Sequence, residues 1–253
     1  MKTSFKKIIF FIFCFFSFSG VVNAQNKTYL IGVEDLEYLP YYTSKNDRYT
    51  GFAREILDTF ARKQGYVFKY RILPIKRLLY DFLEQKVDFK FPDNPNWKKA
   101  IKKGVPVIYT NSVVGFVDGV MVLPLNKGKS IKSIKTLGTV LGFTAWDYLD
   151  LIKSKKITLF ENNSLTGLIK QALAGRVDGV YINPVVCNYQ LGKVFKKKSG
   201  LVFDPNLPHT RSSYMLSSIK HLKIIEAFNR FLVDNKQMIE RLKKRYNVKV
   251  MNQ

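Results

Sequence analysis

The chain has 253 residues, of which 46% are hydrophobic, so it can bury one large core or two modest ones. Lysine and arginine (42) far outnumber aspartate and glutamate (19), and a formal net charge of +23 favours anionic partners such as a membrane surface, an envelope polymer or an acidic solute. With only two histidines, His209 and His221, a zinc cluster is not expected.

The first 24 residues have the composition of a secretory signal peptide. Three lysines precede an apolar run at Ile8–Phe16, and a small residue, Ala24, stands at the expected cleavage site. A membrane anchor is the alternative, but the run is shorter than the roughly 20 residues that span a bilayer. Cleavage would leave residues 25–253 with Cys187 as the single thiol, which excludes an intrachain disulfide. The remaining lysines are spread over nearly every segment without interleaved aromatics, which indicates a solvated basic surface and no nucleic-acid site.

The first part of the mature chain alternates strands and helices. An apolar run at 30–33 predicts a strand, and a helix is expected from the N-cap Thr50 to Gly65. A second strand at 66–72, a helix opened by Pro74 and a third strand at 87–91 follow. The order β-α-β-α-β predicts a parallel sheet with right-handed crossovers.

Ligands of open α/β sheets bind beyond the carboxyl ends of the strands, so polar and aromatic residues there are candidate ligand contacts. Packing in the core or capping of a turn is the alternative for each of them. A charged candidate, Arg77, follows the Pro74 turn and could face either the cleft or solvent. The run 98–103 is interpreted as a solvated lysine stretch. The other candidates in this half are Glu34, Tyr38, Tyr41, Phe52, Asp93, Asn94 and Trp97.

The strand–helix pattern restarts after an apolar run at 113–122, where we place the crossing into a second lobe. Strands are expected at 139–141 and 157–160, and helices are expected after the caps Thr144 and Ser164. Asp147 lies three residues after Thr144, as in a capping box. The remaining expected features are a helix opened by Asn183-Pro184, a return crossing at 201–203 and 214–216, and a helical tail.

Two segments, 82–91 (FLEQKVDFKF) and 172–181 (ALAGRVDGVY), both run from a helix end through a basic residue into Val-Asp and a strand. They predict similar supersecondary units in the two halves. The expected division is a first lobe made of 25–112 and 201–253, with a second lobe made of 113–200.

These pieces together resemble the extracellular solute-binding proteins of family 3, the bacterial periplasmic binding proteins for amino acids and similar polar solutes. The resemblance rests on the export signal, the opening GVEDLEYLPY, the Gly51-Phe52 helix start, FLEQKVD, the Gly142-Phe143-Thr144 helix start and ALAGRVD, in this order over most of residues 28–248. It implies the type II periplasmic binding protein-like fold, in which two α/β lobes joined by two crossing strands close on a ligand. It further implies a periplasmic monomer without a cofactor that delivers a solute to an inner-membrane ABC transporter permease.

The resemblance also points to departures at the ligand site. Where amino-acid binders of this family carry a carboxylate-binding arginine, this chain offers Asp93, Asn94, Trp97, Lys98 and Lys99, and lysine does not reproduce the guanidinium fork. The family's ammonium-binding aspartate falls on Asn183. The helix start at Phe143 and Thr144 would still bind a carboxylate or phosphate through its backbone N–H groups. A small polar or anionic solute is therefore expected, with an ordinary α-amino acid disfavoured.

Two other functions stay open from the sequence. An envelope-associated hydrolase or dehydratase on the same scaffold would need an acid/base pair, for which Glu34, Asp35 and Asp93 are the nearby acids, although no nucleophile motif is present. A basic envelope interaction protein would instead use the positive charge on lipid or polymer.

Overall fold

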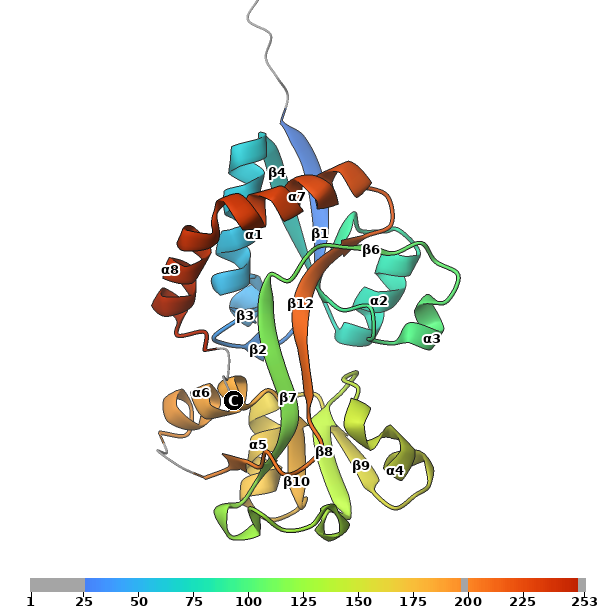
Figure 1. The fold of residues 1–253 in the computed structure, drawn as a ribbon, viewed down its shortest axis with the longest axis vertical. Coiled ribbons are helices and arrows are strands. Elements are labelled where there is room, and N and C mark those ends of the chain that lie inside the picture. Colours follow the sequence, from blue (N-terminus) through green and yellow to red (C-terminus); the bar gives the residue numbers. More distant parts are fainter. Residues whose placement is uncertain (1–25, 197–199, 250–253) are drawn as a thin grey trace, which may run out of the picture.

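The computed structural model describes residues 26–196 and 200–249, so the predicted signal peptide, residues 1–24, lies outside the described residues. Two α/β lobes are stacked one above the other, and two long strands, β7 (Val114–Val122) and β12 (Thr210–Ser218), run between them (Figure 1). Within the described residues, no helix has the length and apolar character needed to cross a membrane.

The first lobe contains the predicted parallel sheet. Strand β1 (Lys27–Glu34) lies between β4 (Tyr66–Leu73) and β5 (Phe89–Asp93), and it is parallel to both, which confirms the β-α-β-α-β prediction. The other elements of this lobe are β2 (Glu37–Tyr38), β3 (Tyr42–Thr43), α1 (Phe52–Gln64), α2 (Ile75–Leu83), α3 (Lys99–Lys102), β6 (Ile108–Tyr109), α7 (Leu222–Asp234) and α8 (Lys236–Tyr246).

The second lobe repeats this plan. Strand β8 (Thr136–Val140) lies between β9 (Thr158–Asn162) and β10 (Gly179–Ile182), and it is parallel to both. Each lobe adds one crossing strand antiparallel to its sheet: β12 pairs with β5 in the first lobe, and β7 pairs with β10 in the second. The remaining elements of this lobe are α4 (Leu149–Lys153), α5 (Leu165–Leu173), α6 (Pro184–Lys193) and β11 (Val202–Phe203).

The Val-Asp repeat has the same structural role in both lobes. Asp88 accepts a hydrogen bond from the Leu30 N–H (2.8 Å) in the first strand of its lobe. Asp178 likewise accepts from the Thr136 N–H (2.7 Å) and the Lys135 N–H (2.8 Å) at the start of β8. Each aspartate therefore ties the segment after a helix to the first strand of its sheet, and the predicted similarity of the two supersecondary units is confirmed.

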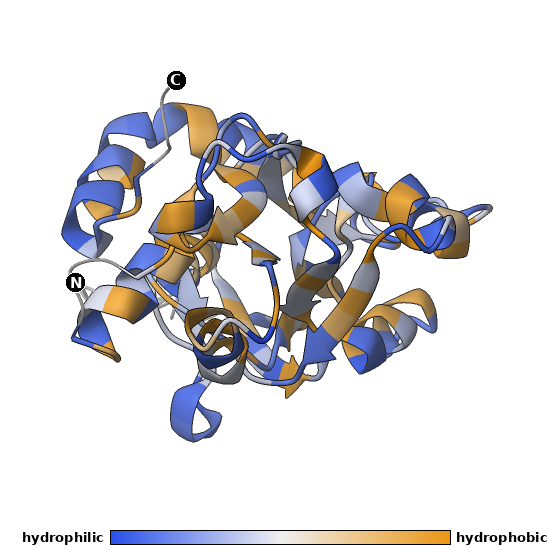
Figure 2. Cartoon of the chain, turned by 90° about the horizontal axis from the view of Figure 1, so that it is seen from below, coloured by the Kyte–Doolittle hydropathy of each residue, from blue (hydrophilic) through white to orange (hydrophobic). Residues whose placement is uncertain are grey.

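The helices pack as their apolar spacing predicts. The face of α1 that carries Phe52, Ile56 and Phe60 is fully buried, and the helix ends at Gly65, whose φ of 67° is the left-handed value that glycine adopts most easily. In Figure 2, hydrophobic segments gather where helices meet strands, while the peripheral helices carry hydrophilic outer turns. The thiol of Cys187 is buried in this core, as expected.

Two predicted helix starts were wrong. Helix α1 is preceded by Gly51, with φ 111°, and not capped by Thr50. Thr144 caps no helix, because a short 3-10 turn at Trp146–Tyr148 precedes α4. The reason is that Asp147 does not bond back to the backbone: its carboxylate accepts from the hydroxyls of Tyr181 (3.0 Å) and Thr210 (2.8 Å), which distant strands supply.

The return crossing runs through β12. Residues before it still belong with the second lobe, since β11 pairs with β7 at Val202↔Val122 and Leu207 lies in that lobe's core. We therefore propose that the boundary between the lobes on the return path lies within β12, and that the expected boundary at 201 should move accordingly. The crossing at the start of β7 is proposed to remain the other boundary.

Candidate functional site

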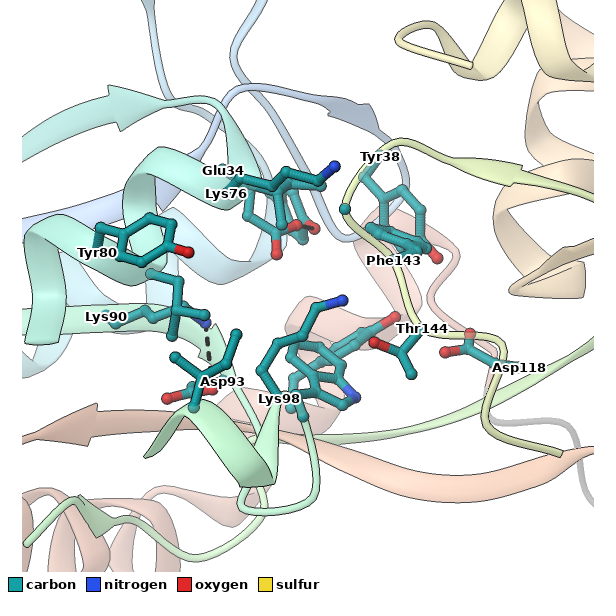
Figure 3. Close-up of a pocket in the computed structure, with 17 residues that line it drawn as sticks. Glu34, Tyr38, Lys76, Tyr80, Lys90, Asp93, Lys98, Asp118, Phe143 and Thr144 are labelled. Carbon is teal, nitrogen blue, oxygen red and sulfur yellow. Dashed lines mark hydrogen bonds and ion pairs between the residues drawn. The ribbon is translucent and has the colours of Figure 1, made fainter. Parts of the chain in front are cut away.

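A cavity of about 320 Å³ lies between the lobes, at the carboxyl ends of β1 and β5 and beside the two crossing strands (Figure 3). This volume is at the lower end of the range for small-molecule sites. Its charged lining residues are Glu34, Lys76, Lys90, Asp93, Lys98 and Asp118. Its aromatic lining residues are Tyr38, Tyr42, Tyr80, Trp97, Phe143 and Tyr214.

Glu34 is the last residue of β1 and is buried. The Tyr42 hydroxyl donates a hydrogen bond to its carboxylate. Burial raises the pKa of Glu34 to about 6, although Lys90 and the Tyr42 hydrogen bond oppose the rise and Asp93 adds to it. A carboxyl group held in this way is partly protonated just below neutral pH.

Asp93, at the end of β5, belongs to a buried charge cluster. The Nζ atoms of Lys90 and Lys102 each lie 3.2 Å from its Oδ1, and the Ser217 hydroxyl donates to its Oδ2 (2.7 Å). The Asn94 N–H also donates to Oδ1 (2.8 Å). Because both oxygens already have partners, Asp93 holds the floor of the pocket together and leaves little acceptor capacity for a ligand.

The aromatic lining comes from both lobes and the crossing strands. Tyr214 of β12 stacks on Phe116 of β7, with ring centroids 4.4 Å apart, and lies edge-on to Trp97 (6.0 Å). Tyr38 of the first lobe makes an edge contact with Phe143 of the second (5.7 Å). Aromatic groups on either side of the cavity therefore already touch across the lobe boundary.

Lysines occupy the mouth of the cavity. Lys98, with φ 49°, precedes α3, and burial lowers its pKa, partly countered by Glu161. Lys76 of α2 lies 3.8 Å from the same Glu161 carboxylate on β9. The run 98–103 was thus wrongly interpreted as wholly solvated, since Lys98 lines the cavity and Lys102 is buried under it.

The structure brings six of the predicted site residues to the cavity wall: Glu34, Tyr38, Asp93, Trp97, Phe143 and Thr144. The predicted helix start at Thr144 was wrong, and an anion contact through its backbone N–H groups stays a prediction.

Five predicted site residues lie elsewhere. Phe52 is buried in the core against Tyr246. Arg77 is exposed on α2 and pairs with the buried Asp81 of the same helix (2.6 Å). The Asn94 side chain donates to the Ser212 hydroxyl and to the Ser213 carbonyl, so it links the segment after β5 to β12.

Asn183 and Tyr41 contact each other outside the cavity lining. Asn183 accepts from the Val185 N–H (2.8 Å) as the N-cap of α6, and its amide donates to the Tyr41 hydroxyl (3.3 Å). Tyr41 itself packs edge-on against Tyr214.

The sequence reasoning missed Asp118, in the middle of β7. Its carboxylate reaches the cavity near Thr144 (Figure 3), and its Oδ1 is buried without a hydrogen-bond partner among the described residues. Burial, with added repulsion from Asp147 and Glu34, raises its pKa to about 7. The signal that could have found it is an acidic residue inside the otherwise apolar run 113–122.

The lobes touch on both sides of the cavity. Besides the Lys76–Glu161 pair, the Gln190 amide of α6 donates to the Glu37 carbonyl (3.4 Å), and the Asn183 amide reaches Tyr41. These contacts join segments that lie far apart in sequence and connect the two lobes directly.

Comparison with known proteins found no matching family model and no matching curated protein. Among solved structures, an ancestral arginine-binding protein bound to arginine is similar over 87% of this chain and 98% of that chain (TM-score 0.70, 18% identity). The GluR0 ligand-binding core from Nostoc punctiforme in complex with L-glutamate matches 86% of this chain and 98% of that chain (TM-score 0.68, 15% identity). An arginine 3rd transport system periplasmic binding protein from Legionella pneumophila matches 87% of this chain and all of that chain (TM-score 0.67, 12% identity).

These structures confirm the fold expected from the sequence. The match covers 98 to 100% of the length of each of these three structures, so it includes both lobes and the crossing strands. The chain therefore has the fold of type II periplasmic binding proteins, two α/β lobes joined by two crossing strands.

Proposed function

We propose that this protein is a solute-binding protein that holds a small polar solute between its two lobes and makes no change to it. The observation that carries the proposal is the cavity between the lobes, about 320 Å³ in volume and lined by charged and aromatic side chains. Concave sites of this size, with a few oriented polar groups on an apolar wall, are typical of small-molecule binding.

The connection between the lobes supports capture by hinge closure. Among the described residues, β7 and β12 are the strands that run between the lobes, so bending of these two strands would separate them. The contacts across the boundary include the Lys76–Glu161 ion pair, the Gln190–Glu37 hydrogen bond and the Tyr38–Phe143 edge contact. A ligand that binds the closed form more tightly than the open form shifts the equilibrium toward closure.

Delivery to an ABC transporter is part of the proposal. Solved structures with this fold include an ABC uptake transporter substrate-binding protein from Streptococcus pneumoniae with bound histidine and the substrate-binding protein of an amino acid ABC transporter. By analogy we propose that this chain works as a monomer in the periplasm and passes an amino acid or a related compound to an inner-membrane permease.

A thermal-shift screen of residues 25–253 against amino acids, amines, carboxylates, phosphates and sugars tests the proposal. A ligand at about 100 times its dissociation constant adds roughly 2.7 kcal/mol to the free energy of unfolding, which gives a clear shift. The hit should be recovered chemically unchanged after incubation, and small-angle scattering should show a more compact particle with ligand. Conversion of the hit, or an unchanged envelope, would contradict the proposal.

Two phenylalanines of the second lobe provide a matched pair of variants. Phe143 lines the cavity, whereas Phe160 on β9 is exposed and lies outside its lining. We expect Phe143→Ala to weaken binding of the screened ligand about tenfold or more and Phe160→Ala to leave it unchanged. Equal effects of the two substitutions would mean that the solute binds elsewhere.

A further inference from the structure

Two buried polar atoms in the cavity lack hydrogen-bond partners among the described residues: Oδ1 of Asp118 and the hydroxyl of Tyr38. Tyr38 is 1% exposed, so its hydroxyl is shut off from bulk solvent. Buried polar groups are paired in most native proteins, because an unmade hydrogen bond leaves the cost of desolvation without compensation. Both residues line the same cavity, so a bound molecule that reached these two atoms would supply their missing partners.

The other charged groups of the cavity already have partners. Lys90 pairs with Asp93, and Lys76 pairs with Glu161. Lys98 also interacts electrostatically with the Glu161 carboxylate. The Glu34 carboxylate accepts from the Tyr42 hydroxyl. Among the lining carboxylates, Asp118 is therefore the one with a buried oxygen, Oδ1, that has neither an ion-pair partner nor a hydrogen-bond donor among the described residues.

The position of Asp118 makes a cation the partner it would favour most. Burial raises its pKa to about 7, and the charges that add to this rise come from two further acids, Asp147 and Glu34. A positive group beside its carboxylate would stabilise the ionised form and replace the lost hydration with a charge-assisted hydrogen bond. Within the described residues no group of three or more His, Cys, Asp or Glu side chains could hold a metal ion, so an organic cation fits this position better.

The surrounding side chains set the chemistry of the rest of the ligand. Tyr38 and Tyr214 lie close enough to Asp118 that its charge contributes to raising their pKa values. Aromatic rings attract cations through their faces and pack well against apolar groups. The cavity wall near the lysines adds Ile75, Leu79 and Ile101.

We propose that Asp118 is the cation-recognition residue of the cleft, and that its ligands are organic ammonium compounds with an apolar or aromatic body. The ammonium group donates to Asp118 Oδ1 and to the Tyr38 hydroxyl oxygen, and the body lies against Phe143, Trp97 and Tyr214. This inference rests on the proposed solute-binding function and names the class of solute.

A panel of compounds with one shared body tests the inference. The probes are 2-phenylethylamine, phenylalanine, 2-phenylethanol and 3-phenylpropionate, measured by isothermal titration calorimetry at pH 8 on residues 25–253. We expect the two ammonium compounds to bind and the alcohol and the carboxylate to bind at least tenfold more weakly. Asp118→Asn should weaken binding of the ammonium compounds about 10- to 100-fold, and it should reduce their advantage over the alcohol.

A second variant separates the cation site from the lysine-lined mouth. Lys98→Gln should keep the preference for ammonium over alcohol, because it removes a positive charge at the mouth and leaves the Asp118 carboxylate in place. If wild type binds the alcohol or the carboxylate better than the amines, or if Asp118→Asn binds the amines normally, the inference fails and solute binding stands. If wild type binds no member of this panel and nothing in the wider solute screen, the inference and the proposed function fail together.

Discussion

Replacing Asp118 by asparagine should stabilise the empty protein, and the gain should grow with pH. The structure raises the pKa of this carboxyl from 3.8 to about 7, mainly through burial. In the unfolded chain the group ionises near its ordinary value, so between pH 4 and 7 the unfolded state releases a proton that the folded state keeps. Folding stability due to this group is therefore full below about pH 4 and is lost as the pH rises to about 7.

The size of the stability gain in Asp118→Asn follows from how far the pKa of Asp118 is raised on folding. Each pKa unit corresponds to 1.36 kcal/mol, so a rise of roughly three units costs up to about 4 kcal/mol at pH 8 and about 2 kcal/mol at pH 5. Asparagine has nearly the same shape and no charge, and it avoids this cost at every pH. Urea unfolding of wild type and Asp118→Asn should thus show a difference in the free energy of unfolding that is roughly 2 to 3 kcal/mol larger at pH 8 than at pH 5.

The control is Glu226→Gln, an acid-to-amide change at an exposed position of α7. We expect it to alter the free energy of unfolding by less than about 0.5 kcal/mol. Glu34, whose pKa is also raised, is present in both wild type and Asp118→Asn, so most of its contribution cancels in the comparison. A stability difference for Asp118→Asn that does not change with pH would refute the reasoning.

Three further substitutions test the described contacts. Asp93→Ala leaves Lys90 and Lys102 buried without their acid and should cost about 3–5 kcal/mol in urea unfolding, whereas a loss under 1 kcal/mol would mean that the cluster is hydrated. Glu161→Gln removes the ion pair that Lys76 makes between the lobes, so small-angle scattering of the empty protein should show a larger radius of gyration. An unchanged radius of gyration would argue against this pair as a contact that holds the lobes closed. Asn183→Ala removes the N-cap of α6 and should lower the free energy of unfolding by about 1 kcal/mol, while ligand affinity changes less than threefold. A tenfold loss of affinity would instead make Asn183 a ligand contact.

The order of strands and helices, and several of their ends, could be predicted from the amino-acid sequence. Ser164 caps α5 through the Gly167 N–H, Asn183 caps α6, and Gly65 ends α1, as the residue types predict. Such features depend on contacts within about four residues, which local periodicity and capping preferences describe well. The same reasoning identified the ends of β1 and β5, where Glu34 and Asp93 indeed meet the cavity.

Which of these side chains has a free donor or acceptor for a ligand depends on their three-dimensional arrangement. Asp93 is occupied by Lys90 and Lys102, and Asp147 leaves its expected cap because Tyr181 and Thr210 take its carboxylate. Oδ1 of Asp118 is left without a hydrogen-bond partner among the described residues. Each outcome depends on side chains that the fold brings together from distant strands. The local sequence pattern of a single segment does not show which side chains of other strands will bury it or pair with it.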